Sequence, residues 1–314
     1  MPSPRHPVVF EIVPTSTADG PGRLREEAAK VRNLFEEAGL WGQVNTILIP
    51  QLIAEEGDRP IALADKIDSV DAKRYLSEAL PLEYILTQVS VFTPEAELRA
   101  RIAKLRAAGV NQVVFVGVPR VFDPKDVVGP YPSQAVQLFE KDVPGRGVIL
   151  IPTRPGEVAR FSEKAQAGAT FGLTQLLFSD HIVGFLKELA TRPERPQILL
   201  SFGYVPQLET TRNLIRWLIK DTTAQAQAEM AEVFRIASLS FKEKQEHLVG
   251  LVKQVAEQAV PLGFPLGLHF ECPYGPSKPA MEVFARVLEA WNNVVGSGAN
   301  NEVAPALAPN AGGA

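Results

Sequence analysis

The chain alternates eight times between a short apolar run and a longer segment whose apolar residues recur at helical spacing. Short apolar runs of this kind are typical of parallel strands buried on both faces. The runs are 8–14, 44–50, 84–91, 112–119, 147–153, 171–178, 197–205 and 266–273. Eight strand–helix repeats predict an α/β fold of the (β/α)8 TIM-barrel type. An open doubly wound sheet is the alternative, and the lack of a separate substrate domain favours closure.

Several helix boundaries are marked in the sequence. Segments 22–38 and 94–108 carry apolar residues at helical spacing, with charged residues opposite. Gly39 and Gly109 stand where C-terminal glycines belong, and Thr93-Pro94 predicts an N-cap followed by proline at the first helical position.

The connection before the last run, 207–260, is too long for a single helix, so we expect extra helices there. Its helical patterns are 207–220, 223–237 and 241–259. Residues 1–295 are therefore interpreted as one barrel domain. Residues 296–314 are rich in Gly, Ala, Pro and Asn without periodicity, which predicts a disordered tail.

Composition argues against several classes of function. The net charge is −4 and no Lys/Arg block occurs, so neither nucleic acid nor an anionic membrane is an expected partner. No apolar stretch approaches the ~20 residues of a membrane span, and the N-terminus is too polar for a secretory signal. Cys272 is the only cysteine, which excludes intramolecular disulfides and cysteine metal clusters. We expect a cytoplasmic protein, and the sequence allows a homo-oligomer without fixing the oligomeric state.

Ionisable side chains are scarce in the eight runs. They contain no Lys, Arg or Asp, and Glu11, His269 and Glu271 are their only acidic or imidazole side chains. The active site of a (β/α)8 barrel lies at the C-terminal ends of its strands, so these residues are candidates for chemistry. Without a strand lysine, a Schiff-base aldolase is not expected.

Glu11 is the strongest candidate for a catalytic group. It shares side-chain parity with Val9 and Val13, so it should point into the barrel with them. A carboxyl group in an apolar pocket has a raised pKa, which suits it to proton donation near neutrality. The alternative is a structural ion pair, for instance with Arg120.

The other polar strand residues allow more than one role. His269 and Glu271 share parity on the last strand, so with Glu11 they could bind a metal ion, and a hydrogen-bonded core histidine is the alternative for His269. Gln175 offers a donor and an acceptor that match the N–C–N edge of a heterocycle, or it pairs with another buried polar group. No G-x-G-x-x-G, G-x-x-x-x-G-K-[ST] or G-x-S-x-G motif is present, so a dinucleotide would not be held by a Rossmann fingerprint.

Four segments in order resemble the catalytic barrel of methylenetetrahydrofolate reductases. They are Phe10-Glu11-Ile12-Val13-Pro14; Thr93-Pro94-Glu95 with Leu98-Arg99 and Gly109-Val110; Ala167-Gly168-Ala169 with Thr174-Gln175-Leu176-Leu177-Phe178; and Gly267-Leu268-His269-Phe270. The resemblance covers roughly residues 8–292. It implies an oxidoreductase that converts 5,10-methylenetetrahydrofolate to 5-methyltetrahydrofolate with NADH or NADPH as co-substrate. By position, Glu11 matches the family's general acid and Gln175 its pterin-binding glutamine.

The positions at which the family holds FAD depart from its pattern. A His-Leu-Thr strand is here Ile85-Leu86-Thr87, and a Tyr-Pro…His segment is Ile151-Pro152-Thr153-Arg154-Pro155. The second strand ends in Ile49-Pro50-Gln51, where the family has threonine, and of the flavin-binding set only Lys164 matches. We therefore expect direct hydride transfer from the nicotinamide to the folate, without flavin.

The family's Arg-Gly-Asp turn after the fourth strand is replaced by Gly117-Val118-Pro119-Arg120. Further candidates for substrate contacts are Asp123, Gln51, Glu55, Thr87 and Glu271. No cofactor-binding residues are assigned, no metal is expected, and the choice between NADH and NADPH stays open. The alternatives are an FAD-dependent ping-pong reductase of the same family, a metal-assisted hydrolase or lyase, and a folate-binding barrel without catalysis.

Overall fold

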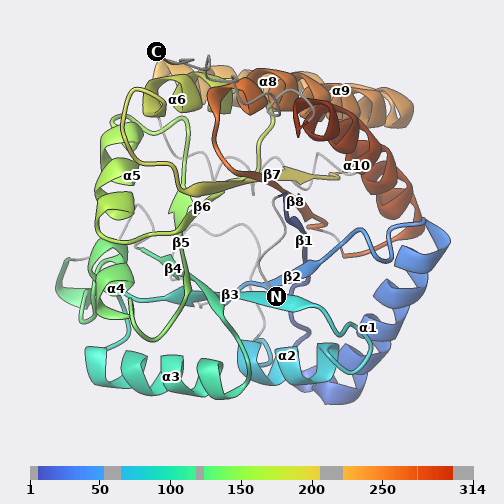
Figure 1. The fold of residues 1–314 in the computed structure, drawn as a ribbon. Helices are drawn as coiled ribbons and strands as arrows, with labels where there is room; N and C mark the ends of the chain where they lie inside the picture. Colours follow the sequence, from blue (N-terminus) through green and yellow to red (C-terminus); the bar gives the residue numbers. More distant parts are fainter. Residues whose placement is uncertain (1–5, 53–64, 118–123, 206–221, 274, 300–314) are drawn as a thin grey trace, which may run out of the picture.

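A computed structural model describes residues 6–52, 65–117, 124–205, 222–273 and 275–299. Its centre is a closed barrel of eight parallel strands in sequence order, in which β1 also pairs with β8 (Figure 1). The strands are β1 Val8–Glu11, β2 Thr46–Ile49, β3 Glu83–Val89, β4 Gln112–Val116, β5 Gly145–Leu150, β6 Phe171–Thr174, β7 Gln197–Gly203 and β8 Leu266–Glu271. The predicted (β/α)8 barrel is confirmed, and the open sheet is excluded.

Helices surround this barrel (Figure 1). They are α1 Gly20–Glu37, α2 Ser69–Leu76, α3 Glu95–Ala107, α4 Pro132–Leu138, α5 Glu157–Gln166, α6 His181–Leu189, α8 Ala224–Ala237, α9 Phe241–Ala259 and α10 Lys278–Ala299. The extra helices predicted at 223–237 and 241–259 are α8 and α9, whereas the pattern at 207–220 lies outside the described residues. None of the described helices is long and apolar enough to cross a membrane.

The helix boundaries follow local backbone chemistry. Gly39 and Gly109 follow the C-cap residues of α1 and α3 with φ of 69° and 78°, a left-handed conformation that glycine adopts without a steric penalty. The predicted start of α3 is wrong by one residue. Pro94 is extended (φ −52°, ψ 145°) and serves as the N-cap, so the helix begins at Glu95. Helix α10 continues to Ala299, past the predicted start of the tail at 296, and residues 300–314 lie outside the described part.

The predicted runs overshoot the observed strands at their C-terminal ends and miss their first residues in two cases. β3 begins at Glu83 and β5 at Gly145, so the strands also contain Glu83 and the buried Arg146, which the predicted runs left out. The Arg146 guanidinium donates to the carbonyl oxygens of Glu140, Val143 and Gly168, which ties loops together at the N-terminal end of the barrel. That end is opposite the one where barrel active sites form.

Two apolar layers hold the barrel. The larger packs the helices against the outside of the strands, and a smaller cluster fills the interior. The interior cluster consists of Val9, Leu48, Ile85, Val114, Phe171, Leu173 and Leu199. Because alternate strand residues face the same way, Glu11 and Gln175 follow Val9 and Leu173 on the inner side.

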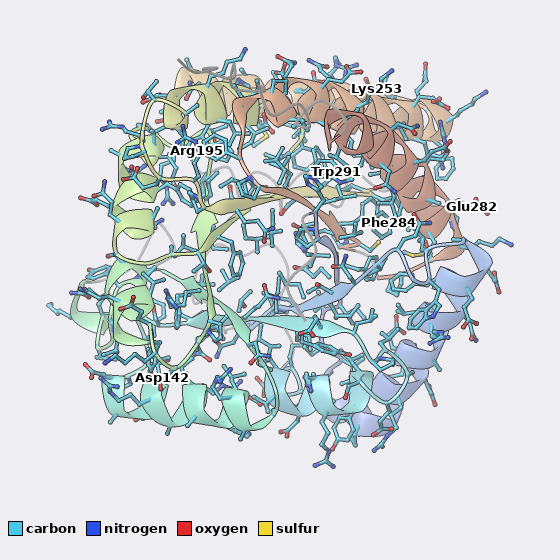
Figure 2. The ribbon with its side chains drawn as sticks, in the orientation of Figure 1. Asp142, Arg195, Lys253, Glu282, Phe284 and Trp291 are labelled. Carbon is cyan, nitrogen blue, oxygen red and sulfur yellow. The ribbon has the colours of Figure 1, made fainter. Side chains whose placement is uncertain are left out.

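Helix α10 covers the seam between β1 and β8 from outside. Phe284 and Trp291 lie on its inner side and Glu282 on its outer side (Figure 2). The Phe284 ring stacks on Phe270 with centroids 4.2 Å apart and on Phe10 at 5.9 Å. Buried aromatic pairs of this kind add to the stability gained from burial itself. They therefore help to hold together the two strands that carry the ionisable residues.

Candidate functional site

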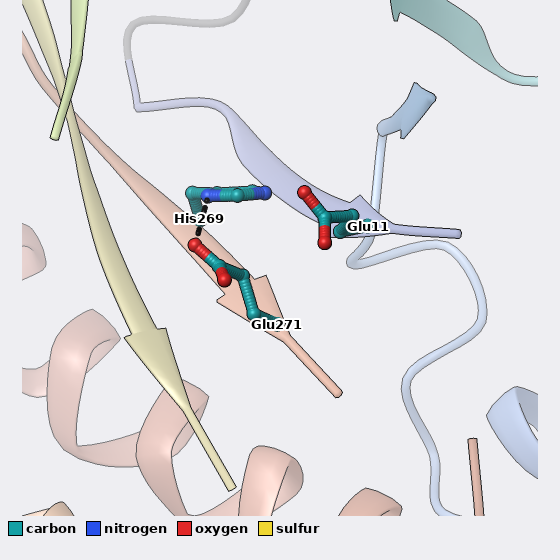
Figure 3. A group of neighbouring side chains, drawn as sticks. All are labelled: Glu11, His269 and Glu271. Atoms are coloured by element: carbon teal, nitrogen blue, oxygen red, sulfur yellow. Dashed lines mark ion pairs between the residues drawn. The ribbon is translucent and has the colours of Figure 1, made fainter. Parts of the chain in front are cut away.

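Glu11, His269 and Glu271 form one cluster at the seam where the barrel closes. Their side chains point toward one another from β1 and β8, as Figure 3 shows. Register explains this: Val9 pairs with His269 and Phe10 with Phe270, so Glu11 follows beside Glu271. One ligand atom from each of the three residues lies within 4.8 Å of the others. The predicted inward orientation and proximity of the three side chains are both found.

The environment of the cluster favours its uncharged forms. Burial raises the pKa of Glu11 from 4.5 to about 7. For Glu271, burial and then the nearby charge of Glu11 raise the pKa well above its usual value. Two carboxyl groups this close cannot both ionise cheaply, so near neutrality the pair keeps at least one proton. Such a pair can donate a proton at a pH where an isolated glutamate is already ionised.

His269 is a neutral, hydrogen-bonded histidine. It is 1% exposed, and burial lowers the pKa of its imidazole from 6.5 to about 3. Its Nδ1 lies 2.8 Å from the Ser201 hydroxyl oxygen, and that hydroxyl donates to the carbonyl oxygen of Thr174 at 2.8 Å. A hydroxyl has one proton to give, so Nδ1–H donates to Ser201. This leaves the Nε2 lone pair, which has no hydrogen-bond partner among the described residues.

The geometry of His269 is compatible with both roles considered for it, a hydrogen-bonded core histidine and a metal ligand. It is a hydrogen-bonded core residue through Nδ1, and it presents a bare Nε2 toward Glu11 (Figure 3). Its Nδ1 lies 3.6 Å from an oxygen of Glu271, beyond hydrogen-bond range for a well-aligned N–H. Sequence reasoning missed Ser201. A single serine within the apolar strand Leu199-Leu200-Ser201-Phe202 was the available signal.

Gln175 occupies the end of β6, on the same rim of the barrel. Its backbone N–H donates to the carbonyl oxygen of Leu150 at 3.0 Å, which extends the β5–β6 pairing by one residue. The residue is half-buried, and no hydrogen bond of its side-chain amide to another described residue is found. Among the described residues, its donor and acceptor are therefore unpaired at the C-terminal end of the barrel.

Gln51 and Thr87 are bonded to one another and to the backbone. The Gln51 N–H donates to the Thr87 hydroxyl oxygen at 2.6 Å, and the Gln51 side-chain oxygen accepts from the Val89 N–H at 2.7 Å. These bonds link the ends of β2 and β3. Their ligand-binding capacity is thereby reduced to the Thr87 hydroxyl proton and the Gln51 amide nitrogen. Glu55, Arg120 and Asp123 lie outside the described residues.

The positions compared with the flavin pattern also take part in the barrel. Ile85 is buried in the interior cluster. The Lys164 ammonium donates to the Ile149 carbonyl oxygen at 3.2 Å and lies 3.9 Å from the Glu157 carboxylate. Burial lowers the pKa of Lys164, and the nearby Glu157 charge partly opposes that shift. Arg154 is half-buried in the loop between β5 and α5.

The fold and the site together define a (β/α)8-barrel protein whose polar and ionisable side chains converge at the C-terminal ends of its strands, as in barrel enzymes. The chain belongs to the mycobacterial methylenetetrahydrofolate reductase family, whose model matches residues 4–294. The resemblance drawn from four short motifs is thus confirmed at the level of the family. A comparison with curated proteins finds no match.

Two solved structures are similar to this chain at low sequence identity, and the first of them shares its fold. An uncharacterized protein from Clostridium thermocellum, described as binding two copies of 5-methyl-5,6,7,8-tetrahydrofolic acid, is 16% identical with a TM-score of 0.64. That likeness covers 92% of this chain and 96% of the other. N-(5'-phosphoribosyl)anthranilate isomerase from Pyrococcus furiosus is 10% identical with a TM-score of 0.45, covering 92% and 100%.

Proposed function

We propose that this protein reduces 5,10-methylenetetrahydrofolate to 5-methyltetrahydrofolate, taking hydride directly from NADH or NADPH. The observation that carries the proposal is the Glu11 carboxyl group, held at the barrel rim with a pKa of about 7. Membership of the reductase family supports the reaction, and the folate-binding description of the Clostridium thermocellum protein supports the substrate class.

The chemistry requires an acid at this place. Opening the five-membered ring of the substrate breaks a carbon–nitrogen bond, and the departing nitrogen needs a proton. Protonated Glu11 supplies it, which leaves an electrophilic iminium at the other nitrogen. A hydride then adds to the exocyclic carbon and produces the methyl group, so the reaction consumes one nicotinamide hydride and one proton. Glu11 regains its proton from solvent or from Glu271 beside it.

Gln175 is the residue proposed to orient the pterin. A carboxamide can donate to one ring atom and accept from its neighbour, which fixes a heterocycle in its plane. The half-buried position of Gln175 on the same rim as Glu11 supports this role. Glu271, which keeps its proton when Glu11 ionises, lies beside Glu11 and would return a proton to it after each turnover.

Direct transfer has a geometric requirement. The nicotinamide and the folate must be bound together, with the reacting atoms roughly 3–3.5 Å apart. Ile85 stands where the family has a histidine, and it is buried in the apolar interior cluster, which supports a flavin-free site. Such a site predicts sequential kinetics, whereas a flavin that shuttles electrons gives ping-pong kinetics.

The deciding experiment combines a visible absorption spectrum with initial rates of NADH and NADPH oxidation. We expect a colourless protein whose double-reciprocal plots intersect when methylenetetrahydrofolate is varied. Stoichiometric FAD with parallel plots would instead identify the flavin-dependent alternative. Folate binding without turnover would identify a non-catalytic barrel.

A divalent-cation site is a second candidate, favoured by one observation. Glu11, His269 and Glu271 offer three ligand atoms within 4.8 Å, and the His269 Nδ1–H is held by Ser201, as the second nitrogen of a metal-bound histidine usually is. A metal-assisted hydrolase or lyase would lose its activity with a chelator and regain it with Zn²⁺ or Mn²⁺. Turnover of the folate that is unchanged by chelator excludes this candidate.

A further inference from the structure

Glu229 on α8 is a buried carboxylate outside the cluster of Glu11. It is 5% exposed, at the place where α8 packs onto the segment that follows β6. That contact is a small apolar cluster separate from the two main ones, and it contains Phe178, Val205, Val233 and Ile236 with Leu176, Met230 and Ala237 beside them. Apolar contacts alone would dock the helix, and a buried carboxylate is costly unless it is hydrogen-bonded. The carboxylate therefore requires an explanation.

The hydrogen bonds that Glu229 makes with described residues come from one short stretch of chain. The Phe178 N–H donates to one carboxylate oxygen at 2.9 Å, and His181 Nδ1 lies 2.9 Å from the other. The Ser179 hydroxyl donates to that second oxygen as well. Three donors from residues 178–181 thus converge on a side chain about 50 positions further along the chain. We refer to Phe178, Ser179, His181 and Glu229 as the α8 clasp.

The clasp is not a nucleophilic triad, although it contains Ser, His and Glu. A triad needs the serine at one imidazole nitrogen and the carboxylate at the other, so that the ring can take the serine proton. Here the Ser179 hydroxyl and the Glu229 carboxylate both face Nδ1 of His181. The hydroxyl also donates its proton to the carboxylate. The arrangement therefore fastens a loop and does not activate a nucleophile.

The fastened loop is the one that carries Gln175. Three successive backbone donors fix this segment: Gln175 N–H to Leu150 on β5, Leu177 N–H to Ser201 on β7, and Phe178 N–H to Glu229. The first two anchors are strand pairings, and the third comes from the clasp. Of the three anchors, only the third depends on a side chain, that of Glu229, and can therefore be removed by a single substitution.

We propose that Glu229 is a positioning residue that, through residues 178–181, holds Gln175 where it orients the pterin ring. This inference rests on the proposed function, because it gives α8 a task in folate recognition. Misplacement of a binding group by about 1 Å can cost on the order of 100-fold in activity, so a clasp three residues away can control affinity. Loss of the clasp should weaken the binding of the folate and leave the binding of the nicotinamide unchanged.

The test uses Glu229→Ala, Glu229→Gln and Ser179→Ala, with Glu232→Gln as a matched control on the same helix. Glu232 pairs with Arg235 one turn away, on a more accessible side of α8. Glu229→Gln keeps an oxygen for the Phe178 N–H and can donate to Ser179. Binding of 5-methyltetrahydrofolate is measured by calorimetry, exchange of the Phe178 amide by mass spectrometry, and KM and kcat by NADH oxidation.

We expect Glu229→Ala to weaken folate binding and raise the folate KM by about tenfold, with faster exchange at Phe178 and an unchanged KM for NADH. Ser179→Ala, which removes one donor, should do the same to a smaller extent. Glu229→Gln and Glu232→Gln should behave like the wild type. Wild-type folate affinity in Glu229→Ala and Ser179→Ala, with faster exchange, overturns this inference alone. A wild-type protein that binds no folate overturns the proposed function and this role together.

Discussion

Glu11 on β1 and Glu271 on β8 lie side by side at the closing seam of the barrel, and the charge of Glu11 raises the pKa of Glu271. The two carboxyl groups therefore titrate as a pair. The first proton leaves near pH 7, the pKa of Glu11, and the second is held more tightly because it would place two negative charges together. This order of proton loss determines how the protein should respond to pH and to substitution.

Turnover should fall as the pH rises through about 7. Glu11 donates only in its protonated form, and that fraction decreases tenfold for each pH unit above its pKa. A profile of kcat/KM for the folate against pH measures this limb directly. A rate that stays constant up to pH 9 would show that Glu11 is not the acid.

Glu11→Gln should reduce kcat by about 10²–10⁴-fold while folate binding persists. The amide keeps the shape of the side chain but cannot give up a proton. Turnover and 5-methyltetrahydrofolate affinity are measured on the same preparation, with Glu282→Gln on the exposed side of α10 as the control. Loss of both properties would instead indicate a damaged barrel.

Glu11→Gln should also make the protein more stable at alkaline pH. The folded pKa of about 7 exceeds the usual 4.5, so the folded state holds a proton that the unfolded state has released. Stability contributed by this group is present below pH 4.5 and is lost as the pH rises to about 7. In the wild type, ionising the buried Glu11 lowers the free energy of unfolding by up to about 3 kcal/mol, and the neutral glutamine avoids this loss. Urea unfolding at pH 8 should show the gain, and at pH 4.5 the two proteins should be alike.

Glu271→Gln should leave the fall in rate on the alkaline side of the pH profile near pH 7. Glu271 keeps its proton while Glu11 ionises, so a neutral amide resembles the form it has at that stage. The pH profile of the variant is compared with that of the wild type. A limb that moves by more than one pH unit would assign the lower pKa of the pair to Glu271.

His269 should stay neutral down to pH 5, with its proton on Nδ1. The pKa of about 3 keeps the imidazole neutral in this range, and the hydrogen bond to Ser201 places its one proton on Nδ1. Nitrogen-15 NMR distinguishes a protonated from a bare ring nitrogen, and Ser201→Ala should abolish the preference for Nδ1. A midpoint near the ordinary histidine value of 6.5 would contradict the assignment.

Much of this architecture was predictable because its physical causes are local. Alternating apolar runs and helical spacing indicate a parallel barrel, and parity places Glu11 and His269 inside it. Strand ends were less predictable: Ile12 and Pro14 continue the apolar pattern of β1, yet the strand ends at Glu11. Hydrophobicity does not encode where a ladder stops, and Pro14 has no N–H to extend it.

The hydrogen-bonded supports of the site could not be predicted in the same way. Ser201 meets His269 across 68 positions, and Glu229 meets Phe178 across 51. Such bonds depend on the three-dimensional arrangement of strands and helices. No sequence motif near Ser201 or Glu229 indicates that they form. In the sequence Glu229 resembles any solvent-facing acid of an amphipathic helix.

The apolar cluster beneath Glu11 also limits traffic through the molecule. Val9, Leu48, Phe171 and their neighbours fill the barrel interior below Glu11, so no ligand can pass along the barrel axis to this carboxyl group from the N-terminal end. Any molecule that reaches Glu11 must therefore arrive from the C-terminal side of the strands. Substrate and product then share one direction of approach and departure.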